Sequence, residues 1–261
     1  MKTAVVVDSV RTGLAKSHRG GFNITRADDM LAHIMNALLD RNPNLPKDAV
    51  EDVIMGCGNP EGPMGHNIGR NAAVLSNLEI STGGTTVNRY CSSGLQTVSM
   101  AASQIMAGCY DTVIAGGVEQ ISMLSGKQNM EGFVNEKLAN DKPGIYHPMG
   151  ITAENVASNY GISRIQQEEF ALKSHYKSFK AQGENKFYEE IIPISNNSKS
   201  ITKDGCIRSN STLEMMSKLE PAFVENGTVT AATSSPLTLS LIHISEPTRL
   251  LSSAYAVFCV K

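Results

Sequence analysis

The sequence contains no tryptophan, no Cys-x-x-Cys pair and no run of basic residues. Aromatic residues make up only 5% of the 261 positions, so a stacking surface for single-stranded nucleic acid is not expected. Lys and Arg are dispersed and the formal net charge is −2, which argues against a polyanionic partner. The first apolar run stops at Asp8, too early for a signal peptide or a membrane-spanning helix. We therefore predict a cytoplasmic globular protein that binds neither nucleic acid nor a membrane.

Cysteine is present but scattered. The five residues lie far apart and no group of Cys and His has metal-ligand spacing, so neither a disulfide framework nor a metal site is predicted. A cysteine in such a sequence is usually a small buried hydrophobe. A chemical role must therefore be argued from local context. The cysteines are Cys57, Cys91, Cys109, Cys206 and Cys259.

Residues 1–123 alternate short apolar runs with amphipathic stretches, which is the pattern of an α/β domain. Helices are predicted where apolar residues recur at three- and four-residue spacing, as Leu31, Ile34 and Leu38 do. Short continuous apolar runs that end in turn residues predict buried strands. The predicted strands cover 3–8, 49–58, 85–88 and 111–117, and the predicted helices cover 26–42 and 66–78.

Residues 124–226 are more polar and carry helix signals with few strand runs. The clearest helix covers 163–182, where Ser163 is a predicted N-cap followed by Gln and acidic residues. Together these features indicate a helical insertion over the α/β unit. Within this region an isolated strand is predicted over 189–195, after which residues 227–238 are predicted to return as a strand followed by a loop. On one face of the 163–182 helix we expect Leu172, Tyr176 and Phe179.

Cys91 lies in the stretch VNRYCSSGL, where a short apolar strand ends and a helical stripe of small residues begins. A sulfur at a helix N-terminus faces unpaired N–H groups and the positive end of the helix dipole, so we expect a lowered thiol pKa. Ser92, Ser93 and Gly94 are small enough to let a substrate approach, and the Cys91 N–H could help to hold an oxyanion. A buried structural cysteine is the competing interpretation, and the local pattern favours the reactive one only slightly.

Several further segments, in the same order along the chain, make the sequence recognisable. Together with the Cys91 stretch they resemble the thiolase family over residues 1–238. Any one of these motifs alone is weak, whereas the ordered set is highly specific. The segments are VVVDSVRTGLAKSHRGGF, MGCGNPEGPMGHNIGRNAAV, NRYCSSGLQ, AGGVEQISM, HPMGITAENVA and GTVTAATSSPLT.

The resemblance implies the N-terminal half of a layered αβαβα fold with a helical loop-domain insertion. It also implies thiolytic cleavage of a 3-ketoacyl-CoA, or the reverse Claisen condensation, through an acyl thioester on a cysteine. Cys91 matches that nucleophile. Coenzyme A and acyl-CoA enter as substrates, and no cofactor or metal is implied. A homo-oligomer, or a subunit of a fatty-acid oxidation complex, is the expected assembly of a full-length protein.

Two other positions match substrate-binding residues of the family. Met149 would line the acyl pocket and Ser235 would contact the pantetheine arm of CoA, although a core methionine and a turn serine remain open alternatives. Asn88 is expected to support the Cys91 loop. The segments RTGLAKSHRGGFNITRADDM and MGCGNPEGPMG resemble the thiolase of bacterial fatty-acid oxidation complexes more than the acetoacetyl-CoA-forming acetyltransferase, which stays a close alternative.

The resemblance stops at residue 238. The family continues there with Asp-Gly-Ala-Ala and a second half that bears a Gly-His-Pro histidine and a Cys-x-Gly-Gly cysteine, whereas this chain reads LSLIHISEPTRLLSSAYAVFCVK. Residues 239–261 resemble a translated adapter from DNA-sequencing libraries, so we interpret them as a non-native tail; a diverged tail forming an edge strand is the alternative. His243 and Cys259 receive no role.

The predicted organisation is thus an α/β domain (1–123), a loop-domain insertion (124–226), a return strand with the start of the pantetheine loop (227–238) and the tail (239–261). Because the family's histidine base is absent from these residues, we expect the polypeptide as printed to be inactive. Two further hypotheses stay open. One is a decarboxylating ketosynthase, which HPMGITAENVA and the long insertion argue against; the other is a non-catalytic fragment that binds CoA or a partner subunit.

Overall fold

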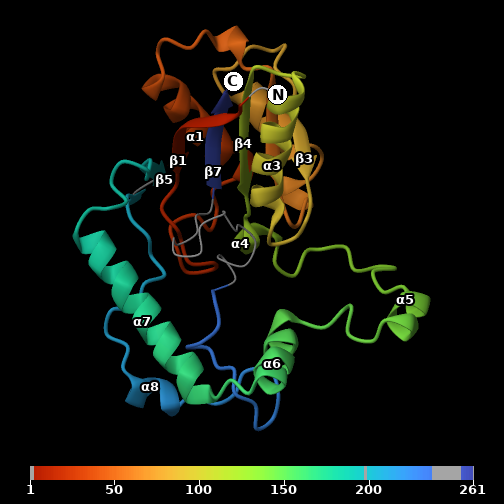
Figure 1. Cartoon of the computed structure of the whole chain (residues 1–261), viewed down its shortest axis with the longest axis vertical. Coiled ribbons are helices and arrows are strands. Elements are labelled where there is room, and N and C mark those ends of the chain that lie inside the picture. The colour runs from red at the N-terminus through yellow and green to blue at the C-terminus, as the bar shows by residue number, and fades with distance from the viewer. Residues whose placement is uncertain (1–2, 197–198, 237–253, 261) are drawn as a thin grey trace. The chain divides into compact units, whose positions relative to one another are not determined.

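The computed structural model describes residues 3–196, 199–236 and 254–260. The chain divides into two compact units, each described by itself. The first comprises Met1–Lys127, Asn185–Cys206 and Pro236–Lys261, and the second comprises Gln128–Glu184 and Ile207–Ser235 (Figure 1). The sequence-based division at residues 123, 226 and 238 stays a prediction.

The first unit is built on a five-stranded sheet with the order β1-β7-β4-β2-β3. Strands β3, β2 and β4 run parallel, whereas β7 runs antiparallel to both of its neighbours. This arrangement confirms the predicted α/β class. The elements are β1 (Val5–Arg11), α1 (Ala27–Arg41), η1 (Lys47–Ala49), β2 (Asp52–Gly56), η2 (Gly62–Met64), α2 (Ile68–Leu75), β3 (Thr85–Val87), α3 (Ser93–Ala107), β4 (Thr112–Val118), α4 (Ile121–Leu124), β5 (Ile194–Asn196), β6 (Lys199–Ile201) and β7 (Ala254–Val260).

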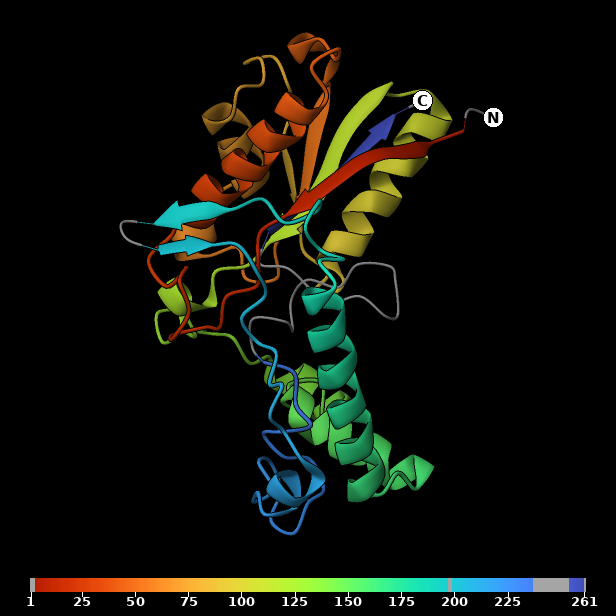
Figure 2. The same ribbon diagram turned by 90° about the vertical axis from the view of Figure 1, so that its left-hand side faces the viewer.

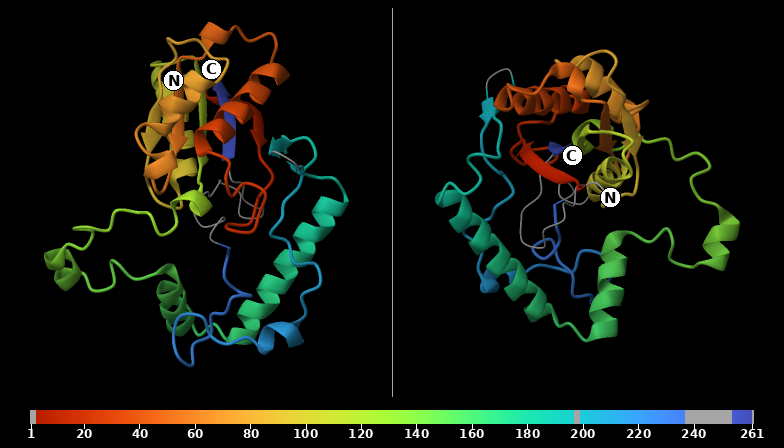
Figure 3. Two further views of the ribbon diagram at one scale, coloured as in Figure 1. Left: turned by 180° about the vertical axis from the view of Figure 1, so that it is seen from behind. Right: turned by 45° about the horizontal axis from the view of Figure 1, so that its top comes forward.

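Helices cover both faces of the sheet, because the central strands are apolar on both sides. On β2, Val53 and Met55 pack into the cluster with α1 and α2, whereas Ile54 packs with α3. Successive side chains of a strand point to opposite faces, so one apolar run supplies two cores. Figure 2 shows α1 and α3 on opposite sides of the strands, and Figure 3 shows α1 and α2 together on the face seen from behind.

The predicted first helix is confirmed as α1. Leu31, Ile34 and Leu38 are fully buried, as their spacing predicts. Asp28 and Asp29 stand in the first turn, where the helix dipole favours negative charge, and Asp28 also pairs with Arg26 at 2.8 Å. Burial of one apolar stripe and complementary end charges explain why this segment is helical.

Strand β7 comes from the C-terminal residues that we interpret as a non-native tail. It lies between β1 and β4, as the blue strand in Figure 1 shows, and not at an edge as the alternative interpretation expects. Its sequence AYAVFCV is rich in the β-branched and aromatic residues that favour strands. The origin of the tail stays a prediction, and His243 lies outside the described residues.

The segment 185–206 returns to the first unit and is fixed there by a buried ion pair. The Arg11 guanidinium contacts both carboxylate oxygens of Asp204, at 2.7 and 3.0 Å, and also bonds Glu190 at 2.8 Å. Charges this well buried are stable only when paired and hydrogen-bonded. Near this cluster β5 pairs with β6 to form a hairpin, so the strand predicted as isolated has a partner.

The second unit is helical where it has regular structure. The predicted capping box is present: the Ser163 hydroxyl accepts the Gln166 N–H, and the Gln166 side chain accepts the Ser163 N–H at 2.8 Å. On the predicted apolar face, however, Tyr176 and Phe179 are more than half exposed. The helices are α5 (Glu136–Asp141), α6 (Met149–Tyr160), α7 (Arg164–Gly183) and α8 (Leu213–Ser217).

In place of the strand predicted after residue 226, the described residues 227–236 form turns with one isolated bridge, between Thr230 and Pro221. Side-chain hydroxyls here take the backbone hydrogen bonds that a strand partner would otherwise make. The Thr233 hydroxyl accepts the Thr230 N–H at 3.0 Å, and the Ser234 hydroxyl donates to the Thr230 carbonyl at 2.8 Å. Such local bonds offer the chain an alternative to a ladder of strand pairs.

Within the described part of the chain, the helices are too short or too polar to cross a membrane.

Candidate active site

Cys91 stands in the turn that joins β3 to α3, as the sequence predicts. The preceding residue, Tyr90, has a positive φ of 46°, which a bulky residue rarely adopts. Such a backbone persists only where its surroundings fix it, and strained turns of this kind cluster at functional sites. The sharp turn therefore places Cys91 directly after a residue with an uncommon backbone conformation.

Side-chain hydrogen bonds hold this turn in place. The Asn88 side chain accepts the Tyr90 N–H at 2.8 Å and donates to the Gly58 carbonyl at 3.1 Å. The Ser93 hydroxyl accepts the Arg89 N–H at 2.9 Å and donates to the Tyr90 carbonyl at 2.6 Å. The contacts of Asn88 agree with its expected role in supporting the loop.

Two glycines, Gly56 and Gly117, allow the start of α3 and the ends of β2 and β4 to lie close together. A Cβ on Gly56 would lie 2.6 Å from the Ser93 carbonyl carbon and 2.7 Å from the Gly94 nitrogen. A Cβ on Gly117 would lie 3.0 Å from the Gly56 oxygen. A side chain at Gly56 would meet backbone too closely to be accommodated without a shift, whereas the contact at Gly117 is tight. The Thr97 hydroxyl adds a bond from α3 to the Gly116 carbonyl of β4, at 2.9 Å.

The electrostatic setting of Cys91 differs from the expected one. Cys91 is half-buried, and burial raises the pKa of its thiol; its own N–H lowers that pKa, and the negative charge of Glu119 raises it further. The predicted lowering of the pKa is therefore wrong in direction. A physical reason is visible in the turn: the N–H groups of Ser92 and Ser93 bond the Arg89 and Tyr90 carbonyls, at 3.1 and 3.0 Å.

Glu119 is a buried residue of this site to which the sequence pattern assigned no role. It follows β4 directly, is 5% exposed, and accepts hydrogen bonds from the Gly58 N–H at 2.8 Å and from the Asn59 N–H and side chain, each at 3.2 Å. Burial raises the pKa of this carboxyl, whereas its hydrogen bonds oppose the rise. An acidic residue immediately after a mostly apolar strand was the signal that could have indicated it.

Met149 and Ser235, the predicted substrate-binding residues, belong to the second unit, whereas Cys91 belongs to the first. Met149 begins α6 and is 69% exposed, so it is not a core methionine in this structure. Ser235 is exposed after the 230–234 turn. Their roles stay predictions.

The segment that leads to Ser235 is attached to α6 by Glu154. The Glu154 carboxylate accepts the N–H groups of Thr228 and Val229, each at 2.8 Å, and the Thr228 hydroxyl at 2.8 Å. Desolvation raises the pKa of Glu154, but these hydrogen bonds outweigh it, so the pKa is lowered. One ionised side chain thus organises the residues 227–229.

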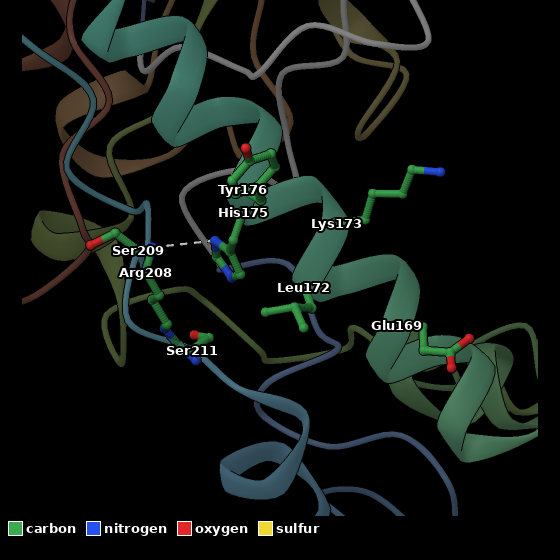
Figure 4. Close-up of a pocket in the computed structure, with 8 residues that line it drawn as sticks. All are labelled: Glu169, Leu172, Lys173, His175, Tyr176, Arg208, Ser209 and Ser211. Atoms are coloured by element: carbon green, nitrogen blue, oxygen red, sulfur yellow. Dashed lines mark hydrogen bonds between the residues drawn. The ribbon is translucent and has the colours of Figure 1, made fainter.

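A cavity of about 400 Å³ lies within the second unit, between α7 and residues 208–211. His175 and Leu172 point from α7 toward this segment, and Lys173 points away from it (Figure 4). His175 accepts the Arg208 backbone N–H at Nδ1, at 3.2 Å, which leaves Nε2 as its donor. Burial and then the charge of Arg208 lower the pKa of His175. The cavity therefore combines a guanidinium, a neutral imidazole donor and hydroxyl groups.

The described residues contain no cluster of three His, Cys, Asp or Glu side chains that could hold a metal ion.

Comparison with known proteins identifies the family. Residues 4–238 match the model of the thiolase N-terminal domain. This chain belongs to the thiolase family. It is 40% identical over 251 residues to a 3-ketoacyl-CoA thiolase of Bacillus subtilis (strain 168), with 90% of this chain and 63% of the relative covered. Proteins of the same description from Aliivibrio fischeri and Shewanella loihica are each 40% identical over 243 residues, with 91% of this chain and 62% of theirs covered. The chain thus spans about 62% of the length of these curated thiolases.

Proposed function

We propose that this chain carries the nucleophilic part of a thiolase that cleaves 3-ketoacyl-CoA with CoA, or runs the reverse condensation. The Cys91 sulfur attacks the keto carbon and forms an acyl thioester. The bond between C2 and C3 breaks, its electron pair stays on C2, and protonation of C2 releases acetyl-CoA. The CoA sulfur then takes the acyl group and frees Cys91.

The observation that carries this proposal is the Cys91 turn itself. A cysteine held in a strained, hydrogen-bonded turn before a 15-residue helix is a prepared nucleophile position. The relatives described as 3-ketoacyl-CoA thiolases support the degradative substrate class over the acetoacetyl-CoA-forming alternative.

The raised pKa means that Cys91 needs a base to react near neutral pH. Among the described residues no histidine hydrogen-bonds the Cys91 sulfur, and the printed sequence contains no Gly-His-Pro motif. We infer that this base comes from residues matching the second half of the family. Met149 and Ser235 remain our proposed acyl-pocket and pantetheine contacts.

The cavity beside Arg208 is our candidate for the phosphate-bearing end of CoA. Its guanidinium can bind a phosphate through two parallel hydrogen bonds, and the His175 Nε2–H and the Ser211 hydroxyl add donors. The proposed assembly into an oligomer or a fatty-acid oxidation complex rests on the family resemblance alone.

The decisive experiment compares two proteins. The printed 261-residue polypeptide is expected to give no measurable thiolysis of acetoacetyl-CoA or of a longer 3-ketoacyl-CoA. Residues 1–238 joined to the second half of the Bacillus subtilis relative are expected to be active, and Cys91→Ser should reduce that rate by several orders of magnitude. Cys109→Ser, at an exposed free cysteine, is the matched control and should keep the rate.

Activity that persists in the Cys91→Ser hybrid would refute the nucleophile assignment. Normal turnover by the printed polypeptide would refute the proposed external base. Calorimetric CoA binding without acyl transfer in the hybrid would favour the non-catalytic alternative. A hybrid that cleaves only acetoacetyl-CoA would favour the acetyltransferase alternative.

A further inference from the structure

The proposed chemistry leaves the buried carboxylate of Glu119 unused, although it is one of the charges that act on Cys91. The apolar end of β4 places it beside the loop after β2, where it bonds Gly58 and Asn59. A buried carboxylate is retained only where it is well hydrogen-bonded, because desolvation of the charge is costly. Its three accepted hydrogen bonds fix the positions of Gly58 and Asn59 in the loop after β2.

A continuous path of hydrogen bonds joins Glu119 to the turn. The carboxylate accepts the Gly58 N–H at 2.8 Å, the Gly58 carbonyl accepts the Asn88 side-chain amide at 3.1 Å, and the Asn88 oxygen accepts the Tyr90 N–H at 2.8 Å. The path ends on the residue with positive φ that directly precedes Cys91. Gly58 is held from both sides, by its N–H and by its carbonyl.

We propose that Glu119 is a positioning residue of the Cys91 turn, acting through Gly58 and Asn88 to hold Tyr90 in its strained conformation. The inference rests on the proposed function, since the turn is what presents the nucleophile. A bond to a charged acceptor is about twice as strong as a neutral one, so the anchor at the buried end of the path is the stronger link.

Glu119 also affects the chemistry of the sulfur through its charge. The titratable and charged groups around it come from three segments: Cys57 at the end of β2, Cys91 before α3, and Lys16, which shares with Glu119 the lining of a cavity of about 20 Å³. The negative charge raises the pKa of both thiols. Removing it should therefore lower the pKa of Cys91 while the turn loosens, and these two effects are measured separately.

The test uses the 261-residue protein and four variants: Glu119→Gln, Asn88→Ala, the double variant, and Glu79→Gln as an exposed control. Hydrogen exchange read by mass spectrometry follows the peptide that covers Asn88 to Ser92. Glu119→Gln should speed its exchange about ten- to hundredfold, the range of a lost charge-assisted hydrogen bond, and Asn88→Ala about tenfold, the range of lost neutral hydrogen bonds. Because both residues act in one path, the double variant should add little. The pH profile of Cys91 alkylation by iodoacetamide should move to lower pH in Glu119→Gln and stay in place in Asn88→Ala.

Additive effects on exchange, or unchanged exchange in Glu119→Gln, would overturn the proposal. An unmoved alkylation profile in Glu119→Gln would equally count against it. Circular dichroism and thermal unfolding check that each variant is folded, and Asn88→Ala keeps the test usable if Glu119→Gln does not fold. These readouts need no acyl transfer, so failure of the proposed thiolase activity would be seen separately, in the hybrid enzyme.

Discussion

The close approach of α3 to β2 predicts a large effect of one methyl group at Gly56. In Gly56→Ala the new Cβ would lie 2.6 Å from the Ser93 carbonyl carbon, 2.7 Å from the Gly94 nitrogen and 2.8 Å from the Ser93 Cβ. Two of these three atoms are backbone, which cannot rotate out of the way. The start of α3 must therefore shift, and the Cys91 turn shifts with it.

The expected magnitude follows from two opposing effects. Overpacking a tight site typically costs about 1–3 kcal/mol, and backbone obstruction places Gly56 in the upper half of that range. Replacing Gly by Ala also reduces the conformational entropy of the unfolded chain, which stabilises the folded state by about 0.4–1 kcal/mol. The net loss of unfolding free energy is about 2 kcal/mol. For a unit of this size each kcal/mol lowers Tm by about 2–4 °C, so we expect a fall of about 4–8 °C.

Thermal unfolding and hydrogen exchange of the peptides around Gly56 and Ser93 measure this effect. Gly183→Ala is the matched control, because nothing lies within 4 Å of its new Cβ and its φ is not positive. It should leave the alkylation rate of Cys91 unchanged and raise Tm by about 1–4 °C, since nothing obstructs the new methyl group and Ala restricts the unfolded chain by about 0.4–1 kcal/mol. A Tm of Gly56→Ala equal to that of the wild type would refute the claimed contact, as would equal losses in the two variants.

Two further predictions concern the second unit. Glu154→Gln should destabilise the attachment of Thr228 and Val229 by about 1–3 kcal/mol at neutral pH. Because the folded pKa of Glu154 is lowered, its stabilisation is full above the unfolded pKa of about 4.5 and is lost as the pH falls through the folded value. The variant's deficit in hydrogen-exchange protection should therefore shrink below pH 4.5, and a constant deficit would contradict this assignment. In the cavity, Arg208→Ala should weaken CoA binding about tenfold by calorimetry, whereas Lys180→Ala, at a residue of α7 outside the cavity lining, should not. Equal affinities in both variants would exclude Arg208 from the CoA site.

Local patterns determine much of this fold, and those elements were predictable from the sequence. Helix α1 carries its apolar residues on one stripe, and its burial of Leu31, Ile34 and Leu38 needs no knowledge of distant partners. The capping box at Ser163 is equally local, because Gln166 lies three residues along the chain. The position of Cys91 between a strand and a helix follows from the same kind of pattern.

What was not predictable depends on contacts between residues far apart in sequence. The interior place of β7 depends on its pairing with β1 and β4, which lie more than 130 residues earlier in the sequence. The Glu119 carboxylate meets Gly58, which lies 61 residues away, so its effect on Cys91 has no signature in the Cys91 stretch. Local reasoning therefore located the turn that holds the proposed nucleophile but predicted the wrong direction for the shift of its pKa.

The raised pKa of Cys91 shows which part of the proposed chemistry the first unit does not provide. The side chains of Asn88 and Ser93 fix the backbone of the Cys91 turn. The N–H groups of Ser92 and Ser93, however, donate to carbonyls of the same turn and therefore do not stabilise a thiolate. Burial and the neighbouring carboxylate both favour the neutral thiol. The first unit therefore holds the Cys91 sulfur in place but does not favour its deprotonation. For the proposed reaction near neutral pH, other residues must bring a proton acceptor to this sulfur. A nucleophile that stays protonated until its base arrives is also protected from premature alkylation and oxidation, because the thiolate is the reactive form.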